Sequence, residues 1–411
     1  MKVLIIGSGT SAHSCAEKIM DNRDIEIKMF TKENNIEYSP CVLPDYIVGE
    51  ISKDALFLRE ESFYDRYPNI IFKKDTEIKS INFTEKYVTT NKQNKYNYDK
   101  LVIASGAEAM MPDIEGVNLE GNYKIKNLND ARKIKEINNQ KIFVIGSGPI
   151  GVEISQALHQ NNEVTLVEKE KQILPKLFDK DISDFANNIL ENMGINIILN
   201  SSVNKISGKN KVEEVRCEDN SYNCDKIIWC IGMCPSTSYI DNKHMDLDKR
   251  GFIKTNEYMK TNINDVYACG DCTKTYDVFK KKYKNVMLWH IAKRGGKIVG
   301  ENILGFDSSM PFLENLYTIK IGSHYFGALG ENSSNNESLE IFSFNIRNKY
   351  FKFKFRGDKL VNCQTIDGPQ ILSSFKTKLN KKIPRLKQDF KDKNFIKILR
   401  KNRGGWMYSD K

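Results

Sequence analysis

Two glycine-rich stretches of the sequence share one spacing of small residues. The first is Gly7-Ser-Gly9-Thr-Ser-Ala12, and the second is Gly146-Ser-Gly148-Pro-Ile-Gly151. In this spacing the first glycine permits a tight turn and the second lets the backbone approach a pyrophosphate, while the third position needs a small residue where a helix packs on a strand. Backbone amides at the start of that helix then face the anion. Both stretches therefore predict a turn that binds the phosphates of a dinucleotide.

The elements around each turn follow the order strand, turn, helix, strand. Short β-branched runs come before the turns, and amphipathic segments with a period of 3.6 residues follow them. The predicted strands are 2–6, 25–30, 141–145 and 164–167, and the predicted helices are 13–20 and 152–159. A single βαβ segment of this kind is weak support, but two of them, roughly 140 residues apart, predict two Rossmann-like dinucleotide-binding domains.

An acidic residue after the second strand of such a segment binds a ribose hydroxyl, about 20 residues beyond the first glycine. Glu168 lies at this position in the second segment, 22 residues after Gly146. Its carboxylate would repel a 2′-phosphate and so favours NADH over NADPH, although Lys169 and Lys171 stand beside it. The first segment has Thr31 at the matching position, which can still hydrogen-bond a ribose.

Three further strands are predicted to end in turns of small residues. They are residues 98–104, which run into Ser105-Gly106, residues 225–231, which run into Gly232, and residues 264–269, which run into Gly270-Asp271. From Met310 the pattern changes to alternating strands at 317–321, 341–345, 350–355 and 360–366, followed by a helical basic tail. This change predicts a separate C-terminal α+β domain.

The composition is that of an ordinary globular protein. The 411 residues are 40% apolar and 28% charged, which predicts two to three domains. No apolar run approaches the roughly 20 residues of a membrane span, and the apolar N-terminal stretch is too short for a signal peptide. We therefore expect a cytoplasmic protein.

The net charge of +10 is concentrated at the C-terminus. Residues 376–411 hold 13 Lys and Arg against 3 Asp and Glu, whereas the charges of the remaining chain balance. This distribution does not support a body that binds nucleic acid. The tail is interpreted as a solvated segment, with an acidic protein partner or the phosphates of a substrate as alternatives.

The nine cysteines do not predict a disulfide framework, because their number is odd and the chain is long. Cys269-Gly-Asp-Cys272 has metal-ligand spacing, but no second pair follows at a suitable distance. No metal site is therefore expected.

Taken together, the order of these motifs resembles the FAD-dependent pyridine nucleotide-disulfide oxidoreductases, and most closely their single-cysteine branch of coenzyme A disulfide reductases and NADH oxidases. The resemblance covers nearly the whole chain. It implies a glutathione-reductase-like α/β fold, FAD on the first turn, NAD(P)H on the second, and a homodimer formed through the C-terminal domain. The implied domains are an FAD-binding domain at 1–112 and 240–308, an NAD-binding domain at 113–239, and a dimerisation domain at 309–411.

The resemblance also implies which residues contact the two cofactors. For FAD they are Gly7, Ser8, Gly9, Thr10, Ser11, Ala12, Thr31, Lys32, Ser39, Pro40, Ser105, Gly106, Gly270 and Asp271, and for NAD(P)H they are Gly146, Gly148, Pro149, Ile150, Gly151, Glu153, Glu168 and Gly232. Glu153 resembles an acidic residue near the nicotinamide, and its alternative interpretation is a first-turn carboxylate that favours the helix dipole.

A catalytic role is implied for Cys41, which stands in Tyr38-Ser-Pro-Cys-Val-Leu-Pro44. In the single-cysteine branch, a cysteine with this neighbourhood faces the flavin. A thiolate there can react with a disulfide, and the sulfur can store a second electron pair. The alternative is an inert thiol that occupies the family position but no longer has a redox role.

The chain departs from the family pattern at several positions. Thr10 stands where family peroxidases carry a histidine, so peroxidase activity is disfavoured, and His13 is expected to pack or lie at the surface. Ile291 and Gly295 stand where the family often has Asn and Gln, in a segment that packs under the flavin. No dithiol of the lipoamide or thioredoxin reductase type occurs near Cys41, so those substrates are disfavoured.

The sequence therefore predicts a cytoplasmic, homodimeric FAD enzyme that oxidises NADH. The electron pair would pass to a small disulfide or persulfide of the coenzyme A type or to oxygen, with Cys41 as the candidate intermediate. The alternative is a flavin electron-transfer subunit that reduces or oxidises a protein partner, such as a rubredoxin, a ferredoxin or a larger oxidoreductase complex, without a thiol role. In that case the basic tail would dock on an acidic partner surface.

Overall fold

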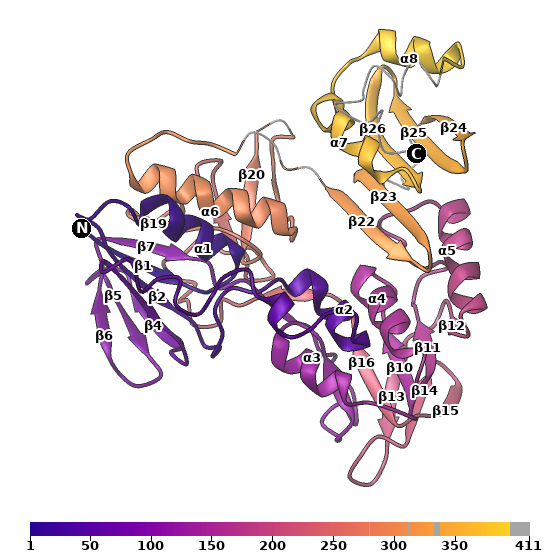
Figure 1. Ribbon diagram of the computed structural model, residues 1–411, viewed down its shortest axis with the longest axis horizontal. Helices are drawn as coiled ribbons and strands as arrows, with labels where there is room; N and C mark the ends of the chain where they lie inside the picture. The colour runs from indigo at the N-terminus through magenta and orange to yellow at the C-terminus, as the bar shows by residue number, and fades with distance from the viewer. Residues whose placement is uncertain (279, 311–312, 314, 333–337, 395–411) are drawn as a thin grey trace. The chain divides into compact units, whose positions relative to one another are not determined.

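The computed structural model describes residues 1–278, 280–310, 313, 315–332 and 338–394 (Figure 1). Contacts between residues divide the chain into two compact units, each built from several stretches. The first unit comprises Met1–Met110, Lys126–Arg132 and Met233–Leu313, and the second comprises Met111–Ile125, Lys133–Gly232 and Glu314–Lys411.

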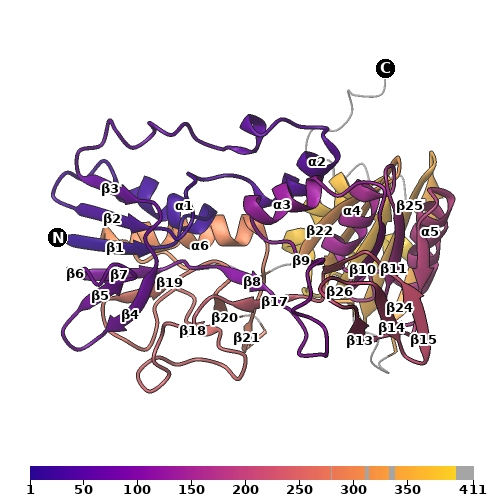
Figure 2. The same cartoon turned by 90° about the horizontal axis from the view of Figure 1, so that it is seen from below.

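The first unit is built on a five-stranded parallel sheet, whose strands lie side by side in the order β19-β7-β1-β2-β3 (Figure 2). Alternate residues of β1 face opposite sides, so that Val3 and Ile5 enter one hydrophobic core and Leu4 and Ile6 enter another. Burial on both faces explains why the strand is apolar from Val3 to Ile6. The strands are β1 (Lys2–Ile6), β2 (Glu26–Phe30), β3 (Ile70–Lys73), β7 (Lys100–Ile103) and β19 (Val266–Ala268).

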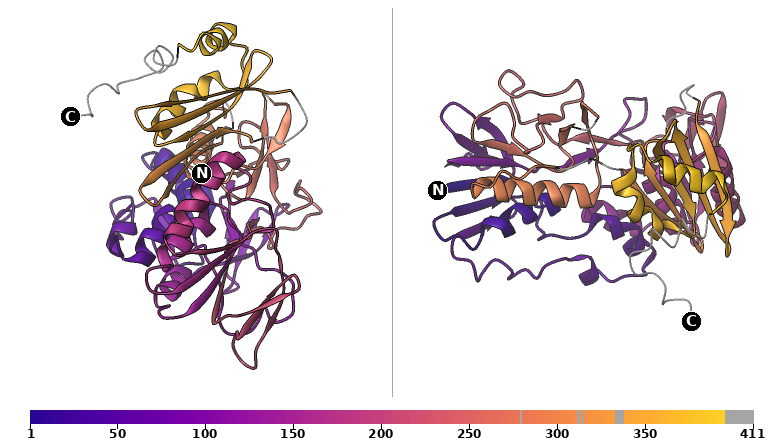
Figure 3. Two further views of the ribbon diagram at one scale, coloured as in Figure 1. Left: turned by 90° about the vertical axis from the view of Figure 1, so that its right-hand side faces the viewer. Right: turned by 90° about the horizontal axis from the view of Figure 1, so that it is seen from above.

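One face of this sheet is covered by two helices that pack closely, α1 and α6 (Figure 3). The contact depends on Gly296 of α6, because a Cβ there would lie 2.0 Å from the carbonyl oxygen of Ser11 on α1. The helices and short 3-10 turns of this unit are α1 (Thr10–Ile19), η1 (Pro40–Val42), α2 (Leu43–Val48), η2 (Asp54–Leu56) and α6 (Trp289–Ile303), and α3 (Leu128–Lys135) begins in it.

Small sheets complete the first unit. An antiparallel sheet has the order β4-β5-β6, a strand pair joins β8 and β17, and a third sheet has the order β18-β20-β21. The strands are β4 (Ile78–Asn82), β5 (Tyr87–Thr90), β6 (Lys95–Asn97), β8 (Ala107–Ala109), β17 (Met233–Pro235), β18 (Ile253–Thr255), β20 (Thr273–Asp277) and β21 (Lys282–Lys284).

The second unit contains a parallel sheet of the same kind, in the order β12-β11-β10-β16-β9. A small antiparallel sheet, β13-β14-β15, adds its apolar side chains to the same core. The elements are β9 (Asn122–Lys124), β10 (Lys141–Ile145), α4 (Pro149–Leu158), β11 (Glu163–Val167), α5 (Lys180–Asn192), β12 (Asn196–Ile198), β13 (Val203–Ser207), β14 (Glu214–Cys217), β15 (Asn220–Asn223) and β16 (Lys226–Trp229). Both predicted βαβ segments are therefore confirmed.

The C-terminal part of the second unit is an antiparallel sheet in the order β22-β23-β26-β25-β24, packed on short helices through a core rich in phenylalanine. Four of its strands were predicted, whereas β23 was missed because Gly327 and Gly330 interrupt its apolar pattern. The elements are β22 (Leu316–Ile321), β23 (His324–Gly330), β24 (Glu340–Ile346), β25 (Lys349–Arg356), β26 (Lys359–Ile366), η3 (Pro369–Ile371), α7 (Leu372–Phe375), η4 (Lys376–Lys378) and α8 (Pro384–Lys391). Residues 395–411 of the basic tail lie outside the described residues.

Among the described residues, no helix combines the length and the apolar composition that a membrane crossing needs.

Candidate cofactor and thiol sites

The first glycine-rich turn joins β1 to α1 in the first unit. Gly7 has a φ of +121°, and a Cβ there would lie 2.1 Å from the carbonyl oxygen of Ala104, so only glycine fits. A Cβ on Gly9, in contrast, would meet no atom within 4 Å. Gly9 is also the N-cap of α1 and makes no side-chain cap bond, so the first amides of the helix are available to a phosphate.

The structure brings five other predicted FAD residues of this unit to the same sheet edge. Thr31 follows β2, Ser105 and Gly106 follow β7, and Gly270 and Asp271 follow β19, each at the carboxyl end of a parallel strand. Ligands of open α/β sheets bind at this edge.

Two contacts fix the neighbours of the first turn. The hydroxyl of Ser8 donates to Oγ1 of Thr31 over 2.8 Å, so the threonine is held beside the turn. Gly270 packs on the first turn of α1, since a Cβ on it would lie 2.6 Å from Oγ of Ser11. Lys32, also expected near FAD, is exposed and forms an ion pair with Glu108.

A cation lies beside Asp271, although no motif in the sequence predicts one there. The ammonium of Lys126 lies 3.3 Å from Oδ2 of Asp271, although the two residues are 145 positions apart. No local sequence pattern predicts this ion pair, because only the fold brings the two stretches of chain together.

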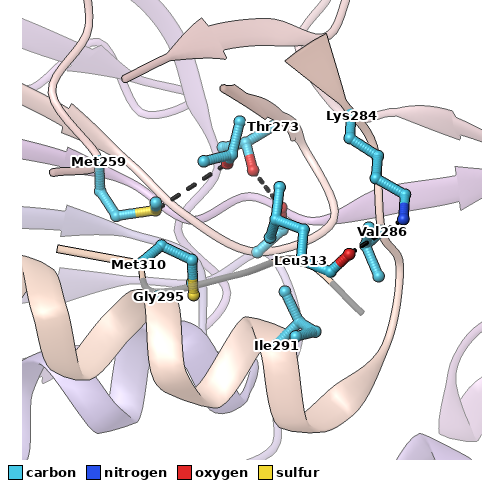
Figure 4. Close-up of a pocket in the computed structure, with 10 residues that line it drawn as sticks. Met259, Thr273, Lys284, Val286, Ile291, Gly295, Met310 and Leu313 are labelled. Carbon is cyan, nitrogen blue, oxygen red and sulfur yellow. Dashed lines mark hydrogen bonds between the residues drawn. The ribbon is translucent and has the colours of Figure 1, made fainter. Parts of the chain in front are cut away.

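A small cavity lies next to the Gly270 turn, between α6 and β20 (Figure 4). Gly295 of α6 faces it, and a Cβ there would approach Sδ of Met259 at 3.5 Å and Cε of Met310 at 3.9 Å. Thr273, Thr275 and Lys284 supply the polar side chains of the lining. Ile291 and Gly295, the two positions at which this segment departs from the family pattern, both line the cavity.

The second glycine-rich turn joins β10 to α4 in the second unit. Gly151 is required by close packing, because a Cβ there would lie 1.8 Å from the carbonyl oxygen of Gly146. A Cβ on Gly148 would meet nothing within 4 Å, and Gly148 caps α4 without a side-chain bond. This turn therefore offers a second set of helix amides to a pyrophosphate.

The helices begin earlier than the sequence pattern predicted. Helix α1 starts at Thr10 and α4 at Pro149, because the last residues of each turn already form the first helical turn and proline suits that position. Glu153 is consequently the fifth residue of α4 and not a first-turn carboxylate. Ile150 is 36% exposed at the helix start.

Glu168 follows β11, the strand beside β10, as its spacing predicted. Its Oε2 accepts hydrogen bonds from the amide (2.8 Å) and the hydroxyl (2.6 Å) of Ser147, and its Oε1 accepts one from the amide of Glu170 (3.0 Å). The carboxylate is buried and oriented at the glycine-rich turn, with further lone pairs for a ribose. Gly232 follows β16, on the other side of β10.

Cys41 lies in η1, directly after Ser39 and Pro40. All nine cysteines fall within the described residues, and none of them forms a disulfide. Cys41 alone is exposed, while Cys230 and Cys234 are half-buried and the other six are buried.

Burial determines the protonation state of three further residues that the sequence singled out, His13, Cys269 and Cys272. His13 is fully buried, its Nδ1 lies 2.6 Å from the hydroxyl of Tyr64, and burial lowers the pKa of His13 to about 3, so the ring is neutral and packs. Burial likewise raises the pKa of Cys272 to about 11 and that of Cys269 well above its usual value. These two thiols are protonated core groups.

The residues present suit both dinucleotides. Each turn combines an open glycine, uncapped helix amides and a third small residue, and the second adds an oriented carboxylate. This is the donor set that dinucleotide pyrophosphates and riboses require.

Comparison with known proteins agrees with this geometry. The sequence profile described as "Pyridine nucleotide-disulphide oxidoreductase" matches residues 1–296. An NADH oxidase of Methanocaldococcus jannaschii is 32% identical over 405 residues, covering 90% of this chain and 88% of the relative. An NAD(P)H coenzyme A polysulfide/persulfide reductase of Pyrococcus horikoshii is 28% identical, covering 75% of this chain and 71% of the relative.

The fold matches as well. The structure of a water-forming NADH oxidase from Lactobacillus brevis superposes with a TM-score of 0.87 at 20% identity, covering 98% of this chain and 100% of that one. The resemblance and the α/β fold expected from the sequence are thus confirmed. The chain belongs to the pyridine nucleotide-disulphide oxidoreductase family and is an FAD-dependent enzyme that uses NAD(P)H.

Proposed function

We propose that this enzyme oxidises NADH and uses Cys41 to reduce a small disulfide or persulfide of the coenzyme A type. The observation that carries the proposal is the position of Cys41. It is the exposed thiol of the chain, and it belongs to the unit that contains the first glycine-rich turn. Oxygen is the alternative acceptor, as the names of the NADH oxidase relatives suggest.

The other cysteines are poor candidates for this chemistry. The thiolate is the reactive form, and burial raises the pKa of Cys217 to about 11 and those of Cys224 and Cys230 to about 12. These thiols are protonated at neutral pH. The persulfide reductase named among the relatives supports a sulfur acceptor.

The proposed reaction balances without a further reductant. FAD, when bound, would supply the means to accept a hydride from NADH and to pass its electron pair on. The Cys41 thiolate attacks one sulfur of the substrate, the substrate S–S bond breaks, and one thiolate leaves while a mixed disulfide forms. The electron pair then breaks this mixed disulfide, which releases the second thiolate and restores Cys41. One NADH and one disulfide thus give NAD⁺, two thiolates and one proton.

Anaerobic titration of the yellow holoenzyme with NADH tests the proposal. We expect uptake of about two equivalents per flavin, because the flavin and a Cys41 sulfur held as a mixed disulfide or a sulfenate each accept an electron pair. A thiolate-to-flavin charge-transfer band should appear after the first equivalent, when the Cys41 thiolate faces a flavin that is still oxidised. Cys41→Ser should take up about one equivalent, lack the band, keep flavin reduction by NADH and lose disulfide turnover. Cys234→Ser, which removes a half-buried thiol, is the matched control and should behave like the parent.

Uptake of about one equivalent by the parent enzyme, without the band, would contradict a thiol role. Full disulfide turnover by Cys41→Ser would do the same. Either result would leave the flavin working alone, with oxygen or an acidic protein partner as the acceptor to examine next.

A further inference from the structure

The segment that leads to Cys41 is attached along its backbone to residues 56–58. The amide of Ser39 donates to the carbonyl of Leu56 over 2.9 Å, and the amide of Leu58 donates to the carbonyl of Glu37 over 3.0 Å. Tyr38 and Phe57 form the bridge between these two bonds. The polypeptide that carries the thiol is therefore part of a two-stranded contact and not a free loop.

The side chain of Glu37 strengthens this attachment. Its carboxylate is 3% exposed, and Nε of Arg59 donates to its Oε2 over 2.7 Å. Burial raises the pKa of Glu37, while the guanidinium of Arg59 opposes this rise. A buried carboxylate without its partner is strongly unfavourable, so the segment and Arg59 stay together.

The other arm of Arg59 reaches the helix of the FAD turn. Its Nη1 lies 2.7 Å from Oε1 of Glu17, which is on α1, the helix that begins at Thr10. The guanidinium also lies 4.4 Å above the ring of Phe63, and the Arg59 side chain is only 13% exposed. A planar guanidinium has separate donors for two carboxylates, which one ammonium does not match.

We propose that Arg59 is a positioning residue that holds the Cys41 thiol at a fixed position relative to the first glycine-rich turn, and so relative to the flavin. Arg59 joins Glu37, four residues before the thiol, to Glu17, on the helix whose first turn faces the FAD pyrophosphate. The inference rests on the proposed function of Cys41. It adds the residue that determines the position of the Cys41 thiol, namely Arg59.

The test uses the FAD-loaded full chain, with its thiols first reduced by dithiothreitol and the reductant removed, and peptide-resolved alkylation with iodoacetamide. In Arg59→Met the segment loses both ion pairs, and Cys41 should be alkylated at least fivefold faster than in the parent, because a thiol held against a cofactor is shielded. Alkylation of Cys234 in the same sample is the internal reference. The thiolate-to-flavin charge-transfer band, measured after one equivalent of NADH while the flavin is still oxidised, should weaken in parallel at unchanged FAD content.

Matched variants separate positioning from general loosening. Arg66→Met is the control, because Arg66 lies over the same Phe63 ring at 5.0 Å and should leave the alkylation rate of Cys41 within twofold of the parent. Arg59→Lys keeps one positive charge and should give an intermediate rate. The double variant Glu37→Gln/Arg59→Met has no unpaired buried charge, so its melting temperature should be higher than that of Arg59→Met. The alkylation rate of Cys41 should nevertheless stay as high as in Arg59→Met.

An alkylation rate of Cys41 within twofold of the parent, or slower, in Arg59→Met would overturn the proposal. Recovery of the parent rate in Glu37→Gln/Arg59→Met would overturn it too, because the effect would then be one of stability. The alkylation readout does not require Cys41 to be redox-active. Failure of the NADH titration would therefore be distinguishable from failure of this positioning role.

Discussion

Glu168 helps to build the second glycine-rich turn, and we expect the same side chain to select the cofactor. Three internal hydrogen bonds, from Ser147 and Glu170, orient its buried carboxylate. The spacing from Gly146 predicted the residue and its ribose contact. The bonds to Ser147 could not be predicted, because a serine between two turn glycines has no pattern of its own.

We expect Glu168→Gln to reduce the preference for NADH over NADPH by about tenfold, or about 1.4 kcal/mol. The amide keeps the shape and can still accept from Ser147, but it no longer repels a 2′-phosphate and bonds a ribose less strongly than a carboxylate. The measurement is kcat/KM for both nucleotides. Glu170→Gln, which changes an exposed carboxylate two residues away, should leave the ratio unchanged. An unaltered ratio in Glu168→Gln would show that other groups set the preference.

Among the secondary-structure elements, α6 packs against the start of α1 and so supports the first glycine-rich turn. Gly296 lets the backbone of α6 approach that of Ser11 at the start of α1. The family resemblance implied that the segment around Ile291 and Gly295 packs beneath the flavin, but it could not reveal which of two adjacent glycines makes the contact. That distinction depends on which face of α6 meets α1.

Gly296→Ala should weaken FAD retention and lower the melting temperature, because its Cβ would lie 2.0 Å from a backbone oxygen at the start of α1. Overpacking of this kind costs about 1–3 kcal/mol. Gly295→Ala is the neighbouring control, since its Cβ would meet its nearest atom at 3.4 Å and should be tolerated. FAD content by absorbance and thermal melting measure both effects. Equal FAD content in the two variants would argue against this role of the contact.

At the scale of the whole molecule, a buried ionic network joins the C-terminal sheet to the nucleotide-binding part of the second unit. Asp179, the N-cap of α5, bonds Lys352 at 2.7 Å and also Lys354, both on β25. Its amide donates to Oε1 of Gln364 over 3.0 Å. The loop that follows Glu168 therefore ends on the C-terminal sheet.

Lys354→Met should destabilise the protein by about 1–2 kcal/mol and lower its melting temperature by a few degrees, because the half-buried carboxylate of Asp179 loses one of its two lysine partners and keeps the other. Although burial opposes it, bonds from Lys352 and Lys354 hold the pKa of Asp179 below its usual value. A depressed carboxyl pKa contributes stability above about pH 4, and this contribution is lost as the pH falls through the folded-state value.

The stability difference between the parent and Lys354→Met should accordingly be full at pH 7 and shrink below about pH 4. Melting curves across this pH range measure it. Lys359→Met, which alters an exposed lysine of the same sheet, should melt like the parent. A pH-independent difference would mean that packing, and not the ion pairs, accounts for the loss.

The domain bounds expected from the sequence stay predictions, as do the homodimer, the cytoplasmic location and docking through the basic tail. Within the described residues, contacts group the C-terminal sheet with residues 133–232. The tail's described part forms η4 and α8, and the rest of it lies outside the described residues.

The sequence by itself determined the features that are local in the chain. Both βαβ segments, the two glycine-rich turns and the acidic residue after β11 are readable because turn chemistry, strand composition and helix periodicity act over a few residues. Glycine positions were especially informative, since a backbone approach at Gly7 or Gly151 excludes every larger side chain.

Only the tertiary structure decided which distant residues share a site. Two ion-pair arrangements depend on stretches that are far apart in the sequence: Lys126 beside Asp271, and Arg59 between Glu17 and Glu37. Strand β23 was missed for another reason, since its sequence lacks a regular apolar period. A buried charge finds its partner through the fold, and the energy of that pairing depends on burial that no single stretch of sequence encodes.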